Sequence, residues 1–92
     1  MDHREERELI LDDAAKLISG DRELDYGAPR VNFGRAAKMW SAHLGIEVDE
    51  ATVCLLMVLL KVSRLSHDQC SRDSWVDAAG YIALGAELRQ EF

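Results

Sequence analysis

The residues best suited to chemistry are two cations near the end of an apolar run. The run from Val53 to Val62 contains one charged residue, Lys61, and Arg64 follows three positions later. Residues three apart share a face of a helix. An unpaired cation in an apolar interior is very costly, so we expect an acidic partner. Asp77, four residues before Tyr81, supplies a carboxylate on the same helix face as a phenol.

This polar group has two interpretations, and the residues alone leave both open. In the first, Lys61, Arg64 and Asp77 form a satisfied ion pair that fixes the register of two helices. In the second, they line a cleft and hold a phosphate or a carboxylate. Arginine suits bidentate recognition of such anions, and lysine acts as a point charge.

A second candidate group surrounds Gly27. Glycine permits a positive φ, and Pro29 suits the first turn of the following helix. Tyr26 and Asn32 would then face a pocket at that helix N-terminus, where free backbone N–H groups can receive an anion. Arg30 and Arg35 would add positive charge. The alternative is an ordinary junction between a loop and a helix.

Four helices must position these residues. Apolar residues recur at helical spacing, and no segment shows the alternation of a strand. Gly20 and Gly45 are expected to end the first two helices, and Asp49 and Asp73 to cap the last two. The expected helices cover about residues 3–19, 30–44, 50–67 and 74–90. Short links between them predict an all-α fold, a compact four-helix bundle with antiparallel helices.

The third helix is expected to be the central one, because Val53 to Leu60 is apolar on every side. Gly80 and Gly85 lie within the fourth helix, where glycine costs about 1 kcal/mol relative to alanine. Small residues there allow close packing, either within the bundle or between subunits. Together with the apolar helix faces, they predict a homo-oligomer.

Composition limits the classes of partner. Ninety-two residues with 48% hydrophobic content predict one helical domain over residues 1–92. A net charge of -6 makes duplex nucleic acid a poor partner. Cys54 and Cys70 do not form a disulfide framework, which fits a reducing cytoplasm. The charged N-terminus argues against a signal peptide, and the apolar run is too short to span a membrane.

Acidic residues in the first helix offer a weak metal site. Glu5, Glu8 and Asp12 have spacings that could bind Mg²⁺, but a solvated charged face is the favoured interpretation. The histidines lack the spacing of a zinc site, and no glycine-rich phosphate loop occurs. We therefore expect no metal site and no cofactor.

Three segments together resemble a small, uncharacterised group of phage and prophage proteins. They read DYGxPxxNFxRxAxxW at residues 25–40, LLKVSRL at 59–65 and DSWVDAAGY at 73–81. The resemblance covers about residues 20–88. That group is similar, more distantly, to the MazG-like all-α nucleoside triphosphate pyrophosphohydrolases. Those enzymes oligomerise and hold Mg²⁺ with an ExxE motif and a later ExxD motif.

This chain departs from the enzyme pattern. Ser74 stands three residues before Asp77, where the ExxD motif has glutamate, and the ExxE that begins at Glu5 lies outside the matched region. Metal-assisted phosphoryl chemistry needs several convergent carboxylates. The resemblance therefore implies a nucleotide-like ligand more than its hydrolysis. Phages also use small helical oligomers to sequester host signalling nucleotides, which implies a counter-defence role in the host cytoplasm.

The expected ligand site combines both polar groups. The cations Lys61, Arg64 and Arg35 would hold phosphate. Asn32 and Tyr26, near the start of the second helix, would bind polar groups of the ligand. Asp77 and Tyr81 of the fourth helix would complete the site. Two other functions stay open. One is a Mg²⁺-dependent nucleotide pyrophosphohydrolase, and the other is a structural module that blocks a host factor through its acidic surface.

Overall fold

The chain folds into helices, as expected. The structure is a computed structural model and describes residues 4–19 and 27–89. These residues form a compact all-α bundle of four helices without strands: α1 (Glu6–Leu17), α3 (Pro29–Leu44), α4 (Glu50–His67) and α5 (Arg72–Leu88). Of the described helices, none is both long and apolar enough to cross a lipid bilayer.

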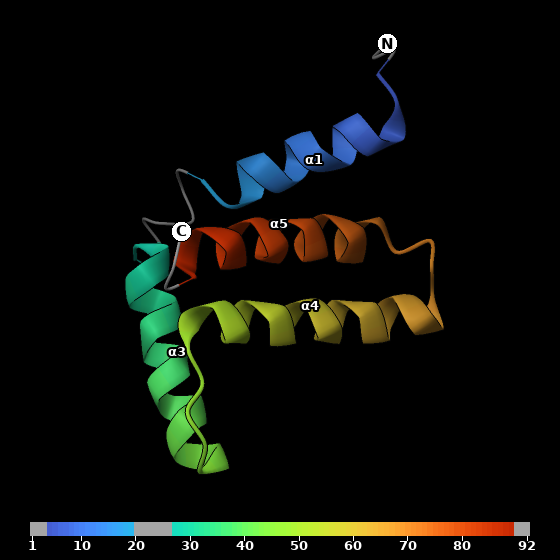
Figure 1. The fold of residues 1–92 in the computed structure, drawn as a ribbon. Helices are drawn as coiled ribbons and strands as arrows, with labels where there is room; N and C mark the ends of the chain where they lie inside the picture. The colour runs from blue at the N-terminus through green and yellow to red at the C-terminus, as the bar shows by residue number, and fades with distance from the viewer. Residues whose placement is uncertain (1–3, 20–26, 90–92) are drawn as a thin grey trace.

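The arrangement of the helices differs in part from an antiparallel bundle. Helices α1, α5 and α4 lie side by side, and α4 and α5 run antiparallel (Figure 1). Helix α3 instead crosses steeply at one end of this layer. Its apolar residues pack with Val48, just before α4, and with Val53 in the first turn of α4. Phe33 of α3 also meets Tyr81 of α5, so α3 contacts both helices of the pair.

Local signals at the helix ends acted largely as predicted. Pro29 occupies the first turn of α3, and Gly45 ends that helix with a φ of 73°. The N–H of Thr52 donates to Oδ1 of Asp49 at 2.8 Å, which confirms the N-cap of α4. The cap of α5 is Ser71, and the prediction of Asp73 was wrong. The N–H of Ser74 bonds to the Ser71 carbonyl, so the helix begins two residues earlier.

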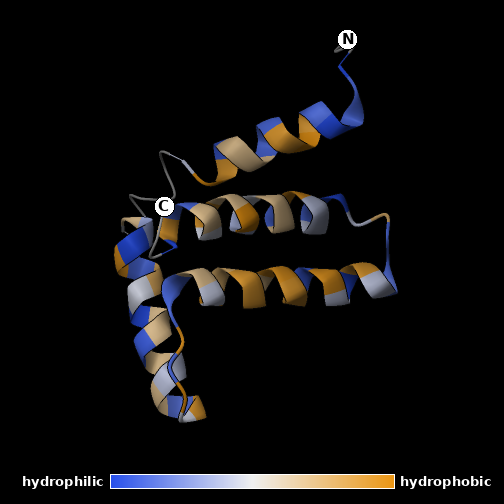
Figure 2. Ribbon diagram, in the orientation of Figure 1, coloured by the Kyte–Doolittle hydropathy of each residue, from blue (hydrophilic) through white to orange (hydrophobic). Residues whose placement is uncertain are grey.

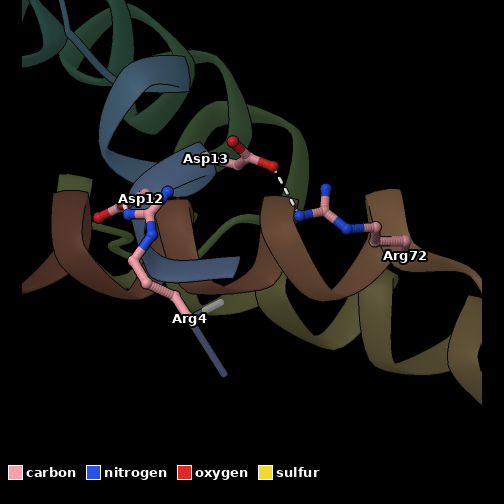
Figure 3. A network of polar contacts seen from close by, with 4 residues as sticks. All are labelled: Arg4, Asp12, Asp13 and Arg72. Carbon is pink, nitrogen blue, oxygen red and sulfur yellow. Dashed lines mark ion pairs between the residues drawn. The ribbon is translucent and has the colours of Figure 1, made fainter. Parts of the chain in front are cut away.

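Gly20, the expected end of the first helix, lies outside the described residues. Helix α1 ends earlier than expected, at Leu17 with Ile18 as its C-cap, and an ion pair connects it to α5. Arg72 and Asp13 form an ion pair at 2.6 Å, and Arg4 pairs with Asp12 near the start of α1 (Figure 3). These side chains are about half exposed, so each pair contributes little to stability.

Helix α4 is buried on one side only, which corrects the expectation of a fully central helix. Val53 and Cys54 are 1% and 0% exposed, whereas Leu55 and Leu59 are 53% and 61% exposed. Figure 2 shows apolar residues along much of α4. Within the described chain α4 packs mainly against α5 and, near its start, against α3. The described residues leave much of the remaining surface of α4 exposed.

The two glycines of α5 serve packing within the chain. A Cβ at Gly85 would lie 3.1 Å from Cβ of Cys54 on α4, and a Cβ at Gly80 would lie 3.0 Å from Cγ2 of Ile18. Both distances are shorter than ordinary contacts. Glycine at these positions therefore allows α4 and the end of α1 to approach α5 closely, and a larger residue would push the neighbouring side chain back by a few tenths of an ångström.

Candidate functional site

A cavity of about 510 Å³ lies where the end of α1 and the first three turns of α3 meet the α4–α5 pair. Ligand pockets in proteins typically have about 300–1,000 Å³. The described lining combines apolar, aromatic and polar residues: Leu17, Ile18, Gly27, Pro29, Asn32, Phe33, Ala36, Trp40, Val53, Met57, Lys61, Asp77, Gly80, Tyr81 and Leu84. Four segments distant in sequence thus share one wall.

An ion pair across the α4–α5 contact supplies the charge of this wall. Nζ of Lys61 lies 3.0 Å from Oδ2 of Asp77. The Lys61 side chain is 11% exposed and that of Asp77 is 28% exposed. Among the described lining residues, these two carry the charge, while Asn32 and Tyr81 add an amide and a phenol. The cavity therefore presents a charged donor and a charged acceptor next to each other.

Aromatic side chains form much of the apolar wall. The rings of Phe33 and Tyr81 meet edge to face, with centroids 6.2 Å apart and planes at 84°. Trp40 lies two turns after Phe33 on the same side of α3 and also lines the cavity. Aromatic faces of this kind can stack with planar ligands such as nucleobases. The site is therefore better equipped for a flat, partly polar molecule than for a small inorganic ion.

The structure brings together four of the residues expected at the site. Lys61 and Asp77 pair, and Asn32 and Tyr81 lie in the same cavity wall. Two other expected residues are placed elsewhere: Arg35 and Arg64 are exposed and do not line the cavity. Tyr26 lies outside the described residues.

Helical rotation explains the separation of the cations. Arg64 is three positions after Lys61, which turns it by about 60° from the direction of Lys61 on a helix with 3.6 residues per turn. Lys61 points toward α5, so this rotation brings Arg64 to solvent. Arg35 is two positions from Phe33 and lies on the outer side of α3. Two cations on the same broad face of a helix therefore need not point into the same site.

Sequence reasoning missed the apolar part of the site. Phe33, Trp40 and Met57 line the cavity, yet their helical spacing is also that of core residues. A polar residue within such a stripe was the available signal. Asn32 lies beside Phe33 and was singled out for this helix face, but nothing in the sequence showed that the stripe borders a cavity.

The cysteines and acidic residues do not extend the site. Burial raises the pKa of the Cys54 thiol to about 11, so this thiol stays protonated at neutral pH. Cys70 is exposed and does not line the cavity. Within residues 4–19 and 27–89, no group of three His, Cys, Asp or Glu side chains could hold a metal ion.

Comparison with known proteins finds relatives among phage proteins. Residues 9–89 match the family model described as "Domain of unknown function (DUF6378)". The chain is 38% identical over 84 residues to the Gene 55 protein of Mycobacterium phage D29, which is 91% of this chain and 56% of that protein. It is also 38% identical over 76 residues to the Gene 55 protein of Mycobacterium phage L5, which is 82% of this chain and 49% of that protein. The chain thus spans about half the length of these relatives. No solved structure gives a significant match.

Proposed function

The chain belongs to the DUF6378 family, and we propose that it binds a nucleotide-like small molecule in the cavity between α3, α4 and α5. The resemblance to phage proteins is confirmed by the two Gene 55 relatives. The more distant similarity to MazG-like enzymes is not shown by these matches. The observation that carries the proposal is the Lys61–Asp77 pair in the wall of an otherwise largely apolar cavity.

The energetics of this ion pair favour a role beyond stability. Both charges lose much of their hydration, and this cost can exceed the attraction between them. Apolar side chains of similar volume often hold two elements together equally well or better. A charged donor and a charged acceptor on a cavity wall, however, can each form a hydrogen bond with a ligand. Lys61 would donate to a phosphate or carbonyl oxygen, and Asp77 would accept from an N–H or O–H group.

The remaining lining favours a ligand with a flat ring. Trp40, Phe33 and Tyr81 offer aromatic surface, and the Asn32 amide can both donate and accept. Lys61 is the cation among the described lining residues, so the cavity can neutralise little of the negative charge of a ligand with several phosphates. The proposed ligand is therefore held mainly through its base and sugar, with one phosphate near Lys61.

Binding without turnover is part of the proposal. Metal-assisted phosphoryl transfer uses several convergent carboxylates, and Asp77 is the carboxylate of the described lining. The phage relatives support a role in an infected bacterium. The chain would sequester a host signalling nucleotide in the host cytoplasm and so weaken a defence response.

Mass spectrometry of molecules released on denaturation tests the proposal first, because a sequestered ligand can survive purification. Calorimetry then measures the affinity of a nucleotide panel that includes mononucleotides and cyclic dinucleotides. Lys61→Met should lower the affinity about 10- to 150-fold, the equivalent of about 1.5–3 kcal/mol for a charged hydrogen bond. Arg72→Met is the matched control, because it also breaks an ion pair but lies outside this cavity.

The outcomes separate the candidate functions. Binding that survives chelator, yields no product and depends on Lys61 supports sequestration. Release of pyrophosphate only in the presence of Mg²⁺ would establish a pyrophosphohydrolase instead. Equal affinity in wild type and Lys61→Met, with both folded, would show that the ion pair has a structural role and that the cavity is not the binding site.

A further inference from the structure

A broad apolar surface on α4 is left exposed by the part of the chain that the structure describes. We call it the α4 outer face and define it by Leu55, Leu56, Leu59, Leu60 and Val62, which are 38% to 61% exposed. The exposed polar residues along its middle are Thr52, Ser63 and Ser66, whereas the exposed His67 and Arg64 lie toward the edge formed by Leu60, so the middle of the face is uncharged. Contiguous exposed apolar surface on a soluble protein usually marks an interaction site.

The residues along the middle of this face have the spacing of a coiled-coil seam. Thr52, Leu55, Leu59, Val62 and Ser66 are separated by three, four, three and four positions. This alternation places side chains along one line that can pack against another helix. The seam spans about 21 Å at 1.5 Å per residue. It has small polar residues at both ends and aliphatic residues between them, so it presents a similar pattern when its direction is reversed.

We propose that a second copy of this chain packs on the α4 outer face, with the two α4 helices antiparallel and a two-fold axis near Leu59. A surface that matches its own reversed copy suits an isologous contact, in which both copies use the same patch. Charge favours the same patch. Each copy carries a net charge of -6, and this face has an uncharged middle without acidic residues, so two copies can approach here with little direct repulsion. In the antiparallel arrangement the partly positive N-terminus of each α4 lies beside the partly negative C-terminus of the other, which is favourable.

This contact is independent of the proposed ligand site. Val53, Met57 and Lys61 point from α4 into the cavity, and they lie on the side of the helix away from Leu59. The dimer would thus carry two cavities that face away from the shared α4 pair. A failure of the dimer would leave the ligand proposal standing, and the reverse also holds.

Light scattering with size-exclusion chromatography at about 10–100 μM chain tests the proposal. Wild type should have the mass of a dimer. Leu59→Lys should have the mass of a monomer, because two like charges would meet at the two-fold axis. Leu11→Lys is the matched control, since Leu11 is 63% exposed and lies on α1. It should stay dimeric, and circular dichroism should show that both variants are folded.

Cysteine cross-linking tests the geometry. In a Cys70→Ser background, mild oxidation should join Leu59→Cys copies into a covalent dimer, because only residues near the axis meet their own copy. Leu55→Cys should not cross-link in the antiparallel arrangement, although it lies on the same face. A monomeric wild type, a dimer that persists in Leu59→Lys, or efficient cross-linking through Leu55→Cys would each overturn the proposal.

Discussion

Replacing both members of the Lys61–Asp77 pair should separate its effect on stability from its effect on binding. Lys61→Met leaves the Asp77 carboxylate without its partner in the cavity wall. Breaking a fully buried ion pair costs about 3–5 kcal/mol. Asp77 is 28% exposed and stays partly hydrated, so we expect a smaller loss of about 1–2 kcal/mol in the free energy of unfolding.

The double variant Lys61→Met/Asp77→Leu removes both charges and fills the same space with apolar atoms. We expect its free energy of unfolding to return to within about 1 kcal/mol of wild type, because neither charge then lacks a partner. Ligand affinity should not recover, since both hydrogen-bonding groups are gone. The two properties should therefore diverge in this variant.

Urea unfolding followed by circular dichroism measures the stability, at one fixed protein concentration for all variants. With a slope of about 1 kcal/mol per molar urea, the midpoint of Lys61→Met should fall by about 1–2 M. The reasoning is refuted if the double variant is as unstable as the two single variants combined. Additive losses would mean that the two charges do not stabilise each other, and that each side chain contributes through separate contacts.

Three further predictions concern the helix cap, the thiols and the close helix contact. Hydrogen bonds from Thr52, chiefly from its side chain, lower the pKa of Asp49 below its ordinary value of 3.8. The stabilisation by this cap should therefore be complete above that pH and be lost as the pH falls through the lowered pKa; Asp49→Ala should cost about 1 kcal/mol at neutral pH, measured by urea unfolding. A thiol reagent at pH 8 should modify Cys70 at once and Cys54 only after unfolding, because burial raises the pKa of Cys54 to about 11; two rapidly reacting thiols in the native protein would contradict the packing of α4 on α5. Gly85→Ala places a Cβ 3.1 Å from Cys54 and should destabilise by about 1–3 kcal/mol, less the roughly 1 kcal/mol gained from helix propensity; thermal unfolding measures the net effect, and an increase in stability would show that the helices can separate freely.

Much of the local structure follows from the sequence, because local signals decide it. Pro29, Gly45 and Asp49 act through their own backbone geometry or hydrogen bonds, so they mark helix ends without help from distant residues. The start of α5 was predicted wrongly at Asp73, because Ser71, two residues earlier, is also a residue type that caps helices well.

The sequence also predicted the central feature of the candidate site. A lone lysine in an apolar run needs an acidic partner, and Asp77 is that partner. The same reasoning could not select among the arginines. Arg64 shares a broad helix face with Lys61, but only the position of α5 determines which part of that face is covered.

Tertiary structure alone decided the shape of the cavity and the exposure of α4. The run from Val53 to Leu60 is apolar all around, and the sequence by itself determines that some partner should cover it. Which sides are covered depends on where α3 and α5 lie, and α3 turns away across one end of the layer. Helical periodicity describes the order of residues around an axis, but it contains no information about the direction from which another helix approaches.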